Sequence, residues 1–283
     1  MRLSIITINY NNAEGLRKTL ASVAAQTYSE FEHVIIDGAS NDGSVDVIRE
    51  YADKNHENKS SHKITWVSEH DSGIYNAMNK GIRIAQGEYI EILNSGDWLA
   101  ADDVVERMLK VLEEKDCPDI LYGNMMKLYP NGNFVDTCGN ALYTPASFLY
   151  FYKGTLNHNC AYIRRSLFER FGLYDEQMKI CSDWKWYVDA IAIGGVKPVY
   201  VNINVTYFNM DGVSESGGKN ADIIKQERRQ YLQQILPQTI LNDYDNFGFP
   251  ILQYQRLKKY HLWGFVYFIE RILFKLEKWR ILR

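Results

Sequence analysis

The chain is poor in cysteine and has no long apolar run. Its four cysteines, Cys117, Cys138, Cys160 and Cys181, form no CxxC pair, which excludes a CxxC metal knuckle or redox motif. Free thiols in a reducing compartment are the expected state. No run of about 18 apolar residues predicts a membrane-spanning helix, and the apolar run at the N-terminus is too short for a signal peptide. These absences predict a cytoplasmic protein.

An excess of positive charge is also absent. The net charge is −3, so the composition gives no indication of nucleic-acid binding, and we expect no nucleic-acid partner. The charge is uneven, because residues 256–283 carry +6 and the rest of the chain −9.

Short apolar runs alternate with amphipathic segments in the first part of the chain. The runs are typical of buried parallel strands, and the segments between them have apolar residues at helical spacing. The predicted strands are Leu3–Asn9, Phe31–Asp37, Ile64–Ser68, Glu88–Leu93 and Ile120–Tyr122. Strands that alternate with helices predict an α/β fold with a Rossmann-like, mostly parallel sheet flanked by helices.

The pattern becomes mixed after residue 123. The predicted elements are a hairpin at Met125–Thr137, a helix at Asp183–Ile193, strands at Lys197–Val201 and Val205–Asn209, a polar loop at Gly212–Asn220, and helices at 221–236 and 255–283. We therefore divide the chain into residues 1–123, residues 124–215 and a helical C-terminal extension, residues 216–283.

The turn after the first strand contains no glycine. A dinucleotide fold would have a GxGxxG turn there, but this chain has Asn9-Tyr10-Asn11-Asn12, and a phosphate-binding P-loop is also absent. A nucleotide on this sheet must therefore be held by side chains and a metal ion rather than by a glycine-rich backbone.

Polar side chains follow each of the first four predicted strands. Ligands bind beyond the carboxyl ends of strands in such sheets, where these side chains would gather. They are Asn9 and Tyr10, then Asp37, then Glu69 and Asp71, and then Asn94 and Asp97. Loop polarity alone explains one such residue, but acids after three successive strands favour a ligand site.

Several motifs in fixed order resemble family-2 glycosyltransferases with the GT-A fold. They cover about residues 1–215 and are Ser4–Asn11, Gln26–Tyr28, Ile35–Ser44, Ser68–Gly81, Gly87–Asp97, His158, Arg164–Phe168, Ser182–Trp184 and Gly212–Ser214. The resemblance implies that residues 1–123 bind a nucleoside-diphosphate sugar and that residues 124–215 bind the acceptor.

The resemblance also implies roles at the donor site. Tyr10 would stack on or beside the base, although a core tyrosine at a strand end is an equal alternative. Asp37 would accept hydrogen bonds from the base or ribose, or else close the turn around Ser40. Asp71 would lie near the sugar and ribose, or else cap the helix that begins near Ser72.

A divalent cation, Mg²⁺ or Mn²⁺, is implied at Asp97, where it would bridge the diphosphate. The family usually has Asp-x-Asp in this motif, whereas this chain has Asn94 and Gly96 at those two positions. Mg²⁺ keeps several waters and needs few protein ligands, so one carboxylate is compatible with it. Asn94 then remains as a donor-site residue.

Asp183 is the expected catalytic base. Inverting transfer needs one group that takes the proton from the acceptor hydroxyl, and a carboxylate between Trp184 and Trp186 would have its pKa raised by burial. The alternative is that Ser182 or Asp183 caps the helix that follows. Both tryptophans fit either a sugar platform or the core. His158 would touch the leaving diphosphate or the acceptor, or else be structural.

Basic and aromatic residues alternate with aliphatic ones in residues 256–283. This profile favours an amphipathic helix on an anionic membrane surface, and the alternative is packing on the domain or on another subunit. A membrane location would suit a lipid-linked acceptor.

Together these observations predict an inverting glycosyltransferase of polysaccharide or glycan assembly, peripheral on the inner face of a membrane. The donor would be a nucleoside-diphosphate sugar and the acceptor a sugar or a lipid-linked sugar. The rivals are a nucleotidyltransferase, which the missing phosphate loop disfavours, and a non-catalytic nucleotide-sugar-binding or membrane scaffold protein, which the retention of Asp183 disfavours.

Overall fold

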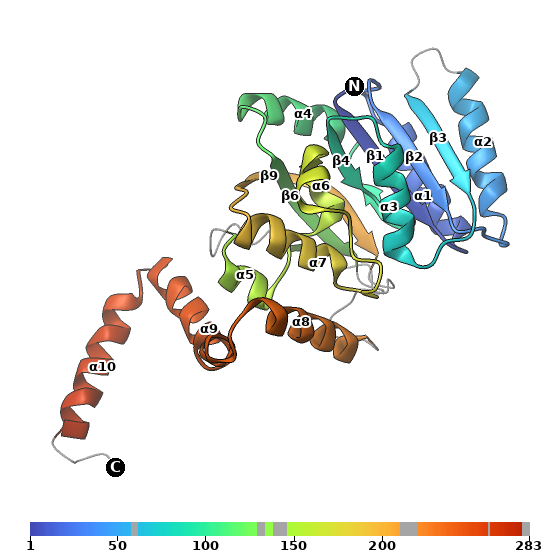
Figure 1. Cartoon of the computed structure of the whole chain (residues 1–283). Coiled ribbons are helices and arrows are strands. Elements are labelled where there is room, and N and C mark those ends of the chain that lie inside the picture. Colours follow the sequence, from blue (N-terminus) through green and yellow to red (C-terminus); the bar gives the residue numbers. More distant parts are fainter. Residues whose placement is uncertain (58–61, 129–133, 138–145, 210–219, 260, 279–283) are drawn as a thin grey trace.

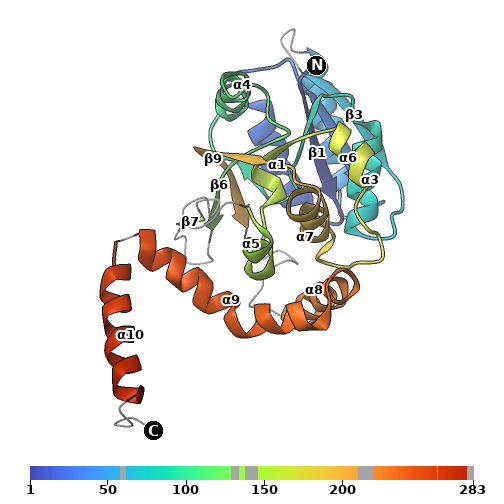
Figure 2. The ribbon, with the colours of Figure 1, turned by 60° about the vertical axis from the view of Figure 1, so that its left-hand side comes forward.

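A nine-stranded mixed sheet forms the centre of the protein (Figures 1 and 2). The computed structural model describes residues 1–283 except 58–61, 129–133, 138–145, 210–219, 260 and 279–283. The strands are β1 Leu3–Asn9, β2 Glu32–Asp37, β3 Lys63–Ser68, β4 Tyr89–Ile92, β5 Trp98–Leu99, β6 Ile120–Leu128, β7 Phe134–Thr137, β8 Ala161–Arg164 and β9 Pro198–Asn209.

Their order is β3-β2-β1-β4-β8-β6-β9-β5, and β7 pairs with β6. The first four strands in this order are parallel, as the sequence predicted. β8 runs antiparallel between β4 and β6, while β9 is again parallel to β6. The parallel strands therefore end at one edge, where the polar residues predicted for the site lie.

Helices cover both faces of the sheet. They are α1 Ala13–Ala24, α2 Ser44–Glu57, α3 Ile74–Ile84, α4 Val104–Glu114, α5 Phe148–Lys153, α6 Ser166–Phe171, α7 Ser182–Tyr187, α8 Ala221–Ile235, α9 Gln238–Lys259 and α10 Trp263–Lys278, with short segments η1 His158–Cys160 and η2 Val188–Ile193. Helices α3, α5, α6 and α7 pack on one face, and α1, α2 and α4 pack on the other. The predicted α/β architecture is confirmed.

A buried acid lies inside this core. Glu91, in the middle of β4, is fully buried, and neither of its carboxylate oxygens has a partner among the described residues. Burial raises the pKa of this carboxyl well above its ordinary value. The acid is therefore held in its neutral form, because an unpaired buried charge is very costly.

Two predicted elements differ from the structure. Lys197–Val201 and Val205–Asn209 are one strand, β9, because Asn202 and Asn204 alternate with buried Val201, Ile203 and Val205 instead of breaking the strand. Their side chains accept hydrogen bonds from Asn124 on the neighbouring strand, at 3.0 and 3.2 Å. The polar residues between the two predicted strands therefore belong to one continuous strand.

The predicted helix at 255–283 is also wrong. The described residues form α9, which already begins at Gln238, and α10, which begins at Trp263. His261, between them, has a φ of 56°, a left-handed conformation that cannot continue a helix. The pairing of β6 with β7 confirms the predicted hairpin. Segments α7 and η2 confirm the predicted helix at Asp183–Ile193, and α8 confirms the predicted helix at 221–236. The predicted loop at Gly212–Asn220 lies outside the described residues apart from Asn220.

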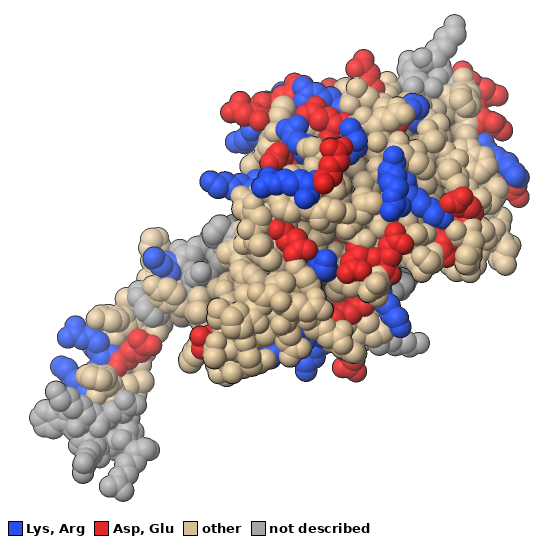
Figure 3. Space-filling view, viewed as in Figure 1, with Lys and Arg blue, Asp and Glu red and all other residues tan. Residues whose placement is uncertain are grey.

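Helix α10 stands away from the sheet in both views (Figures 1 and 2). Its aromatic and aliphatic side chains are largely exposed: Phe265, Tyr267, Phe268, Ile269, Ile272, Leu273 and Phe274. Basic side chains, with acidic ones beside them, lie along the same helix (Figure 3). Among the described residues, no helix is both long and apolar enough to cross a bilayer.

Candidate active site

Three polar side chains lie in a row at the carboxyl edge of the sheet. Asn9, Asp37 and Ser68 end β1, β2 and β3 and pair with one another in register. Asp37 accepts from Asn9 Nδ2 at 2.8 Å and from Ser68 Oγ at 2.6 Å. It also accepts from the Ser40 hydroxyl at 2.6 Å and the Ser40 amide at 3.0 Å. This carboxylate joins the ends of three strands and closes the turn around Ser40.

Asp37 stays ionised although it is fully buried. Burial raises its pKa, but the hydrogen bonds from Ser40, Ser68 and Asn9 outweigh burial and bring the pKa below the ordinary value. The turn-closing role is thus realised. A hydrogen bond from Asp37 to a nucleotide stays a prediction.

Tyr10, Gly38 and Asp71 meet beside this row. Tyr10 is 66% exposed, which excludes the alternative of a core tyrosine. A Cβ atom built on Gly38 would lie 2.5 Å from Asp71 Oδ2 and 3.1 Å from Tyr10 Cδ2. Asp71 also accepts from the Gly73 amide at 3.0 Å, so it caps the turn before α3. The missing side chain at Gly38 lets an aromatic ring and a carboxylate approach each other.

Asp97 lies in the turn between β4 and β5 and is 4% exposed. Its backbone carbonyl accepts from Thr19 Oγ1 at 2.6 Å, and its Oδ2 accepts from Asn159 Nδ2 at 3.1 Å. Its amide donates to the Asn94 carbonyl at 3.0 Å. Hydrogen bonds from three segments therefore fix the turn that carries this carboxylate.

The residues around Asp97 fit a hard divalent cation. Buried Oδ1 atoms of Asn94 and Asn159 have no partner in the described part of the chain. Carboxylate and amide oxygens are ligands that Mg²⁺ and Mn²⁺ accept. Within the described ranges there is no cluster of three His, Cys, Asp or Glu, so Asp97 is the only carboxylate that we assign to such a site.

Asp183 lies in the first turn of α7, and its carboxylate contacts His158 and Tyr75. Its Oδ2 is 3.1 Å from His158 Nδ1, and its Oδ1 accepts from the Tyr75 hydroxyl at 3.0 Å. His158 Nε2 is in turn 3.3 Å from Asn94 Nδ2. The residue at the N-cap position of α7 is Cys181, and no side chain caps it. The capping alternative for Asp183 is therefore not realised.

The pKa of Asp183 differs from the sequence-based expectation. Burial raises the pKa, as predicted, but the His158 and Tyr75 hydrogen bonds and the Trp184 amide outweigh burial and bring it below its ordinary value. Trp184 and Trp186 belong to the core, at 1% and 3% exposure. Their indole nitrogens donate to the carbonyls of Phe151 and Gly172, both at 2.8 Å. The sugar-platform alternative is thus excluded.

Helix α8 braces the segment that leads to Asp183. The Glu227 carboxylate accepts from three successive backbone amides, Lys179 at 2.5 Å, Ile180 at 3.1 Å and Cys181 at 3.0 Å. Ile180 also accepts from the Tyr75 hydroxyl through its carbonyl. Both contacts hold the backbone immediately before α7 and so position the candidate base.

Sequence reasoning missed Tyr75, Asn159 and Glu227. Asn159 could have been predicted from the sequence, because the polar triplet Asn157-His158-Asn159 precedes a strand. The sequence around Tyr75 and Glu227 does not indicate their roles, since each forms hydrogen bonds with a segment about 50 to 110 residues away in the chain. Of the cysteines, Cys117, Cys160 and Cys181 are free thiols, as expected, and Cys138 lies outside the described residues.

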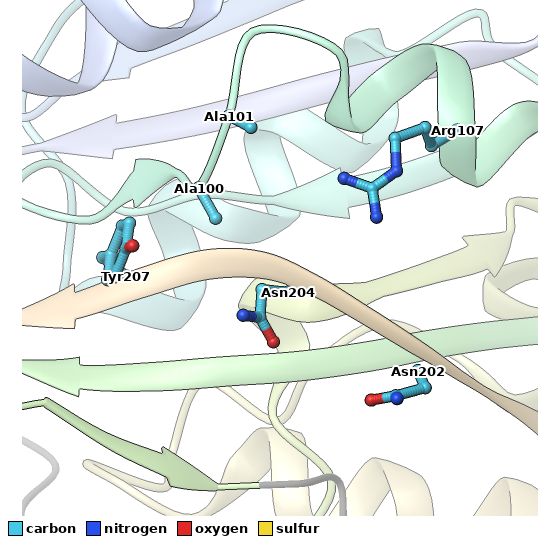
Figure 4. A pocket seen from close by; sticks show the side chains of 6 residues that line it. All are labelled: Ala100, Ala101, Arg107, Asn202, Asn204 and Tyr207. Atoms are coloured by element: carbon cyan, nitrogen blue, oxygen red, sulfur yellow. The ribbon is translucent and has the colours of Figure 1, made fainter.

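A separate cavity of about 400 Å³ lies between the segment after β5, α4 and β9 (Figure 4). Its lining residues are Ala100, Ala101, Arg107, Asn202, Asn204 and Tyr207. None of the residues predicted for the site lines it.

Comparisons with known proteins agree with this fold. Residues 4–172 match the model of Glycosyl transferase family 2, and the chain belongs to this family. It is 28% identical over 224 residues to a PGL/p-HBAD biosynthesis glycosyltransferase of Mycobacterium bovis, covering 79% of this chain and 81% of that protein. An uncharacterized glycosyltransferase of Mycobacterium tuberculosis is 30% identical over 214 residues, covering 75% of this chain and 76% of that one. The protein is a glycosyltransferase.

Solved structures support the same fold. The chain resembles S. aureus TarS 1-349 in complex with UDP-GlcNAc, with a TM-score of 0.61 and 18% identity, over 77% of this chain and 61% of that one. It also resembles the mannosyltransferase PcManGT from Pyrobaculum calidifontis in complex with GDP-Man and Mn²⁺, with a TM-score of 0.62 and 20% identity, over 93% and 72%. The GT-A fold expected from the sequence is confirmed.

Proposed function

We propose that this glycosyltransferase moves a sugar from a nucleoside-diphosphate sugar to a sugar or lipid-linked sugar acceptor, with inversion, in polysaccharide or glycan assembly. The observation that carries the proposal is the contact chain Asp183–His158–Asn94, which leads from a partly buried carboxylate to the turn that holds Asp97. In this proposal the contact chain connects the base to the site for the leaving group.

The donor would bind along the carboxyl edge. Tyr10 supplies an exposed ring for the base, and Asp71 a partly buried carboxylate beside it for the ribose or sugar. Asp37 and Asn9 fix the strand ends underneath, and His158 would face the diphosphate or the acceptor. TarS and PcManGT, which share the fold, were solved with UDP-GlcNAc and with GDP-Man and Mn²⁺, which supports a nucleotide-sugar donor. In this proposal the donor residues come from residues 1–123, and the acceptor residues come from residues 124–215.

Asp183 would act as the general base. It takes the proton from the acceptor hydroxyl while that oxygen bonds to the anomeric carbon, and the bond from this carbon to the diphosphate oxygen breaks on the opposite side. The electron pair leaves with the nucleoside diphosphate. A bound Mg²⁺ or Mn²⁺ would supply positive charge for that diphosphate, and Asp97, Asn94 and Asn159 are the residues to hold the cation.

The C-terminal extension would bind the inner face of an anionic membrane through α10. Seven large apolar side chains of this helix are at least 39% exposed, and Arg271 and Lys275 are exposed on the same helix. Apolar area together with basic charge is the combination that binds helices to anionic lipid surfaces. A peripheral location of this kind would bring the site to a lipid-linked acceptor.

Calorimetric titration with UDP, GDP, dTDP and CDP, each with and without Mn²⁺, tests the donor proposal. We expect one nucleotide to bind with Mn²⁺-dependent affinity, and its sugar derivatives then form the panel for transfer assays. The proposal is wrong if a folded protein binds none of the four.

A further inference from the structure

The cavity between α4, β9 and the segment after β5 has no role in the site described so far. Its volume of about 400 Å³ lies within the range of roughly 300–1,000 Å³ that is typical of small-ligand sites. Most of its lining is polar: the Arg107 side chain extends from α4 toward β9, and Asn202 and Asn204 belong to β9 itself (Figure 4). Two elements therefore offer hydrogen-bonding groups to one ligand.

Strand β9 bulges where it borders this cavity. Strand β6 has one residue, Gly123, between two paired positions where β9 has three residues. A Cβ atom on Gly123 would lie 2.5 Å from the Ile203 carbonyl oxygen, so the missing side chain lets β9 approach this closely. Bulges turn side chains in new directions and occur often beside functional sites. In this bulge Asn202 and Asn204 of β9 both contact the single Asn124 of β6.

The contacts of these asparagines leave their amide nitrogens available. Asn124 Nδ2 donates to Asn202 Oδ1 at 3.0 Å and to Asn204 Oδ1 at 3.2 Å. Asn124 is itself 1% exposed, and its Oδ1 accepts from the Tyr200 hydroxyl at 2.8 Å. Both β9 side chains are exposed, and no described residue accepts a hydrogen bond from their Nδ2 atoms. A buried amide thus holds two donors in place at the cavity.

The lining suits a sugar better than an anion. Arg107 Nη1 is 3.4 Å from Asp103 Oδ1, so a neighbouring carboxylate balances its charge, and the two asparagines are neutral. Tyr207 adds an aromatic ring, which stacks on Trp98 with centroids 5.1 Å apart and ring planes at 28°. Sugar hydroxyls accept hydrogen bonds from amide and guanidinium groups, and the C–H faces of a sugar pack on aromatic rings.

We propose that this cavity is a saccharide-binding subsite that holds a sugar unit of the acceptor beyond the unit that reacts. The inference rests on the proposed glycosyl transfer. Trp98 directly follows Asp97 in the chain, and Ala100, which lines the cavity, is three residues beyond Asp97. Three residues of extended chain span at most about 11 Å. A short oligosaccharide bridges such a distance, so the enzyme should prefer an oligosaccharide acceptor to a single sugar.

Nitrogen-15 NMR of the side-chain amides tests the saccharide site without any donor. Asn202→Asp and Asn204→Asp keep the Oδ1 acceptors for Asn124 but remove the Nδ2 donors, so the missing signals identify the two amides. The probes are maltose, cellobiose, lactose, N,N′-diacetylchitobiose and inorganic phosphate. We expect at least one disaccharide to shift both amide signals with saturation. The proposal is overturned if no disaccharide shifts them, or if phosphate does so at a lower concentration than any disaccharide.

A pair of substitutions on α4 tests whether the cavity itself binds the saccharide. Arg107→Gln should weaken binding of the best disaccharide by about tenfold, because it removes the guanidinium donors. Lys110→Gln is the matched control, since it removes the same charge from an exposed position of α4 outside the lining. Thermal unfolding shows that both variants are folded. Equal losses in the two variants, or no loss in Arg107→Gln, contradict the proposal.

Transfer kinetics with the donor that the nucleotide titrations indicate test the acceptor role. The best-binding disaccharide should have a KM about tenfold or more below that of its component monosaccharide. Arg107→Gln should remove this difference while kcat and nucleotide affinity stay the same. Equal KM values in the native protein, or a disaccharide that binds but accepts no sugar, overturn the acceptor role. If the native protein binds none of the four nucleotides while disaccharides still shift the amide signals, the proposed function fails and the saccharide site stands.

Discussion

Gly38 lies so close to Asp71 that a Cβ atom on the glycine would be 2.5 Å from the carboxylate oxygen Oδ2. Tyr10 borders the same point from the other strand end. Because position 38 has no side chain, space remains between the exposed Tyr10 ring and the Asp71 carboxylate at the proposed nucleobase site.

Gly38→Ala should weaken nucleotide binding by about tenfold or more, corresponding to about 1.4 kcal/mol. The added methyl group displaces the end of the Asp71 side chain, which can move, so the melting temperature should change little. Calorimetry with the nucleotide that the native protein binds measures the effect. Gly264→Ala, where a Cβ meets nothing within 4 Å, is the control. Unchanged nucleotide affinity in Gly38→Ala would show that Tyr10 and Asp71 do not form the nucleobase site.

Asp183→Asn should lower the transfer rate by about 10²–10⁴-fold, because an amide cannot take the acceptor proton. Donor affinity should stay within a few-fold, since Asp183 contacts His158 and Tyr75 rather than the strand edge that we propose for the nucleobase. Transfer assays and nucleotide titrations on the same preparation separate the two effects. Equal losses of rate and nucleotide affinity would point to a structural role for this carboxylate.

Glu91→Met should stabilise the protein at pH 7 by about 1–3 kcal/mol, because it replaces an unpaired buried acid by an apolar side chain. Denaturant unfolding measures this free energy. Glu114→Met on the exposed side of α4 is the matched control, with an expected change within about 0.5 kcal/mol.

The same residue makes stability depend on pH. The pKa of Glu91 is raised in the folded state, so above its ordinary value of 4.5 the folded protein binds more protons than the unfolded chain. Stability should therefore fall as pH rises from about 4.5 towards the folded-state pKa. Glu91→Met should remove this slope in unfolding experiments at several pH values. A slope that persists in the variant would assign it to another group.

Two acidic substitutions on α10, Phe268→Asp and Ile272→Asp together, should abolish binding to vesicles that contain anionic lipid. They break the exposed apolar surface and add negative charge. Co-sedimentation with anionic and with zwitterionic vesicles measures the binding, and native protein should prefer the anionic ones. Gln230→Asp, on the exposed side of α8, is the control for added charge. If the native protein binds neither kind of vesicle but forms a dimer that the substitutions dissociate, α10 is a subunit interface.

The parallel half of the sheet was predictable because its information is local. Each of its strands is short and rich in apolar residues, and β1, β2 and β3 end in polar residues that pair in register at one edge. The sequence predicted β9 as two strands, because the polar residues Asn202 and Asn204 interrupt the apolar run and their partner Asn124 is far away in sequence. The break at His261 depends on a single backbone angle that composition does not encode.

The sequence proposes the residues of the candidate site but does not give their contacts. Asp183 and His158 were both expected in the site, yet their pairing joins positions 25 apart in sequence. The lowered pKa of Asp183 depends on that pairing and on Tyr75, so a residue-by-residue argument from neighbouring tryptophans gave the opposite direction.

Glu227 also bears on how this enzyme can be recombined with others. The family match ends at residue 172, before Asp183, and the carboxylate that clamps the backbone ahead of Asp183 comes from α8, in the C-terminal extension. A chimaera that exchanges only the matched region would combine one protein's proposed donor site with the other protein's candidate base and the carboxylate that holds the backbone before it. A chimaera made to change donor specificity should therefore have its junction after α8, so that the proposed donor site, Asp183 and Glu227 all come from the same protein.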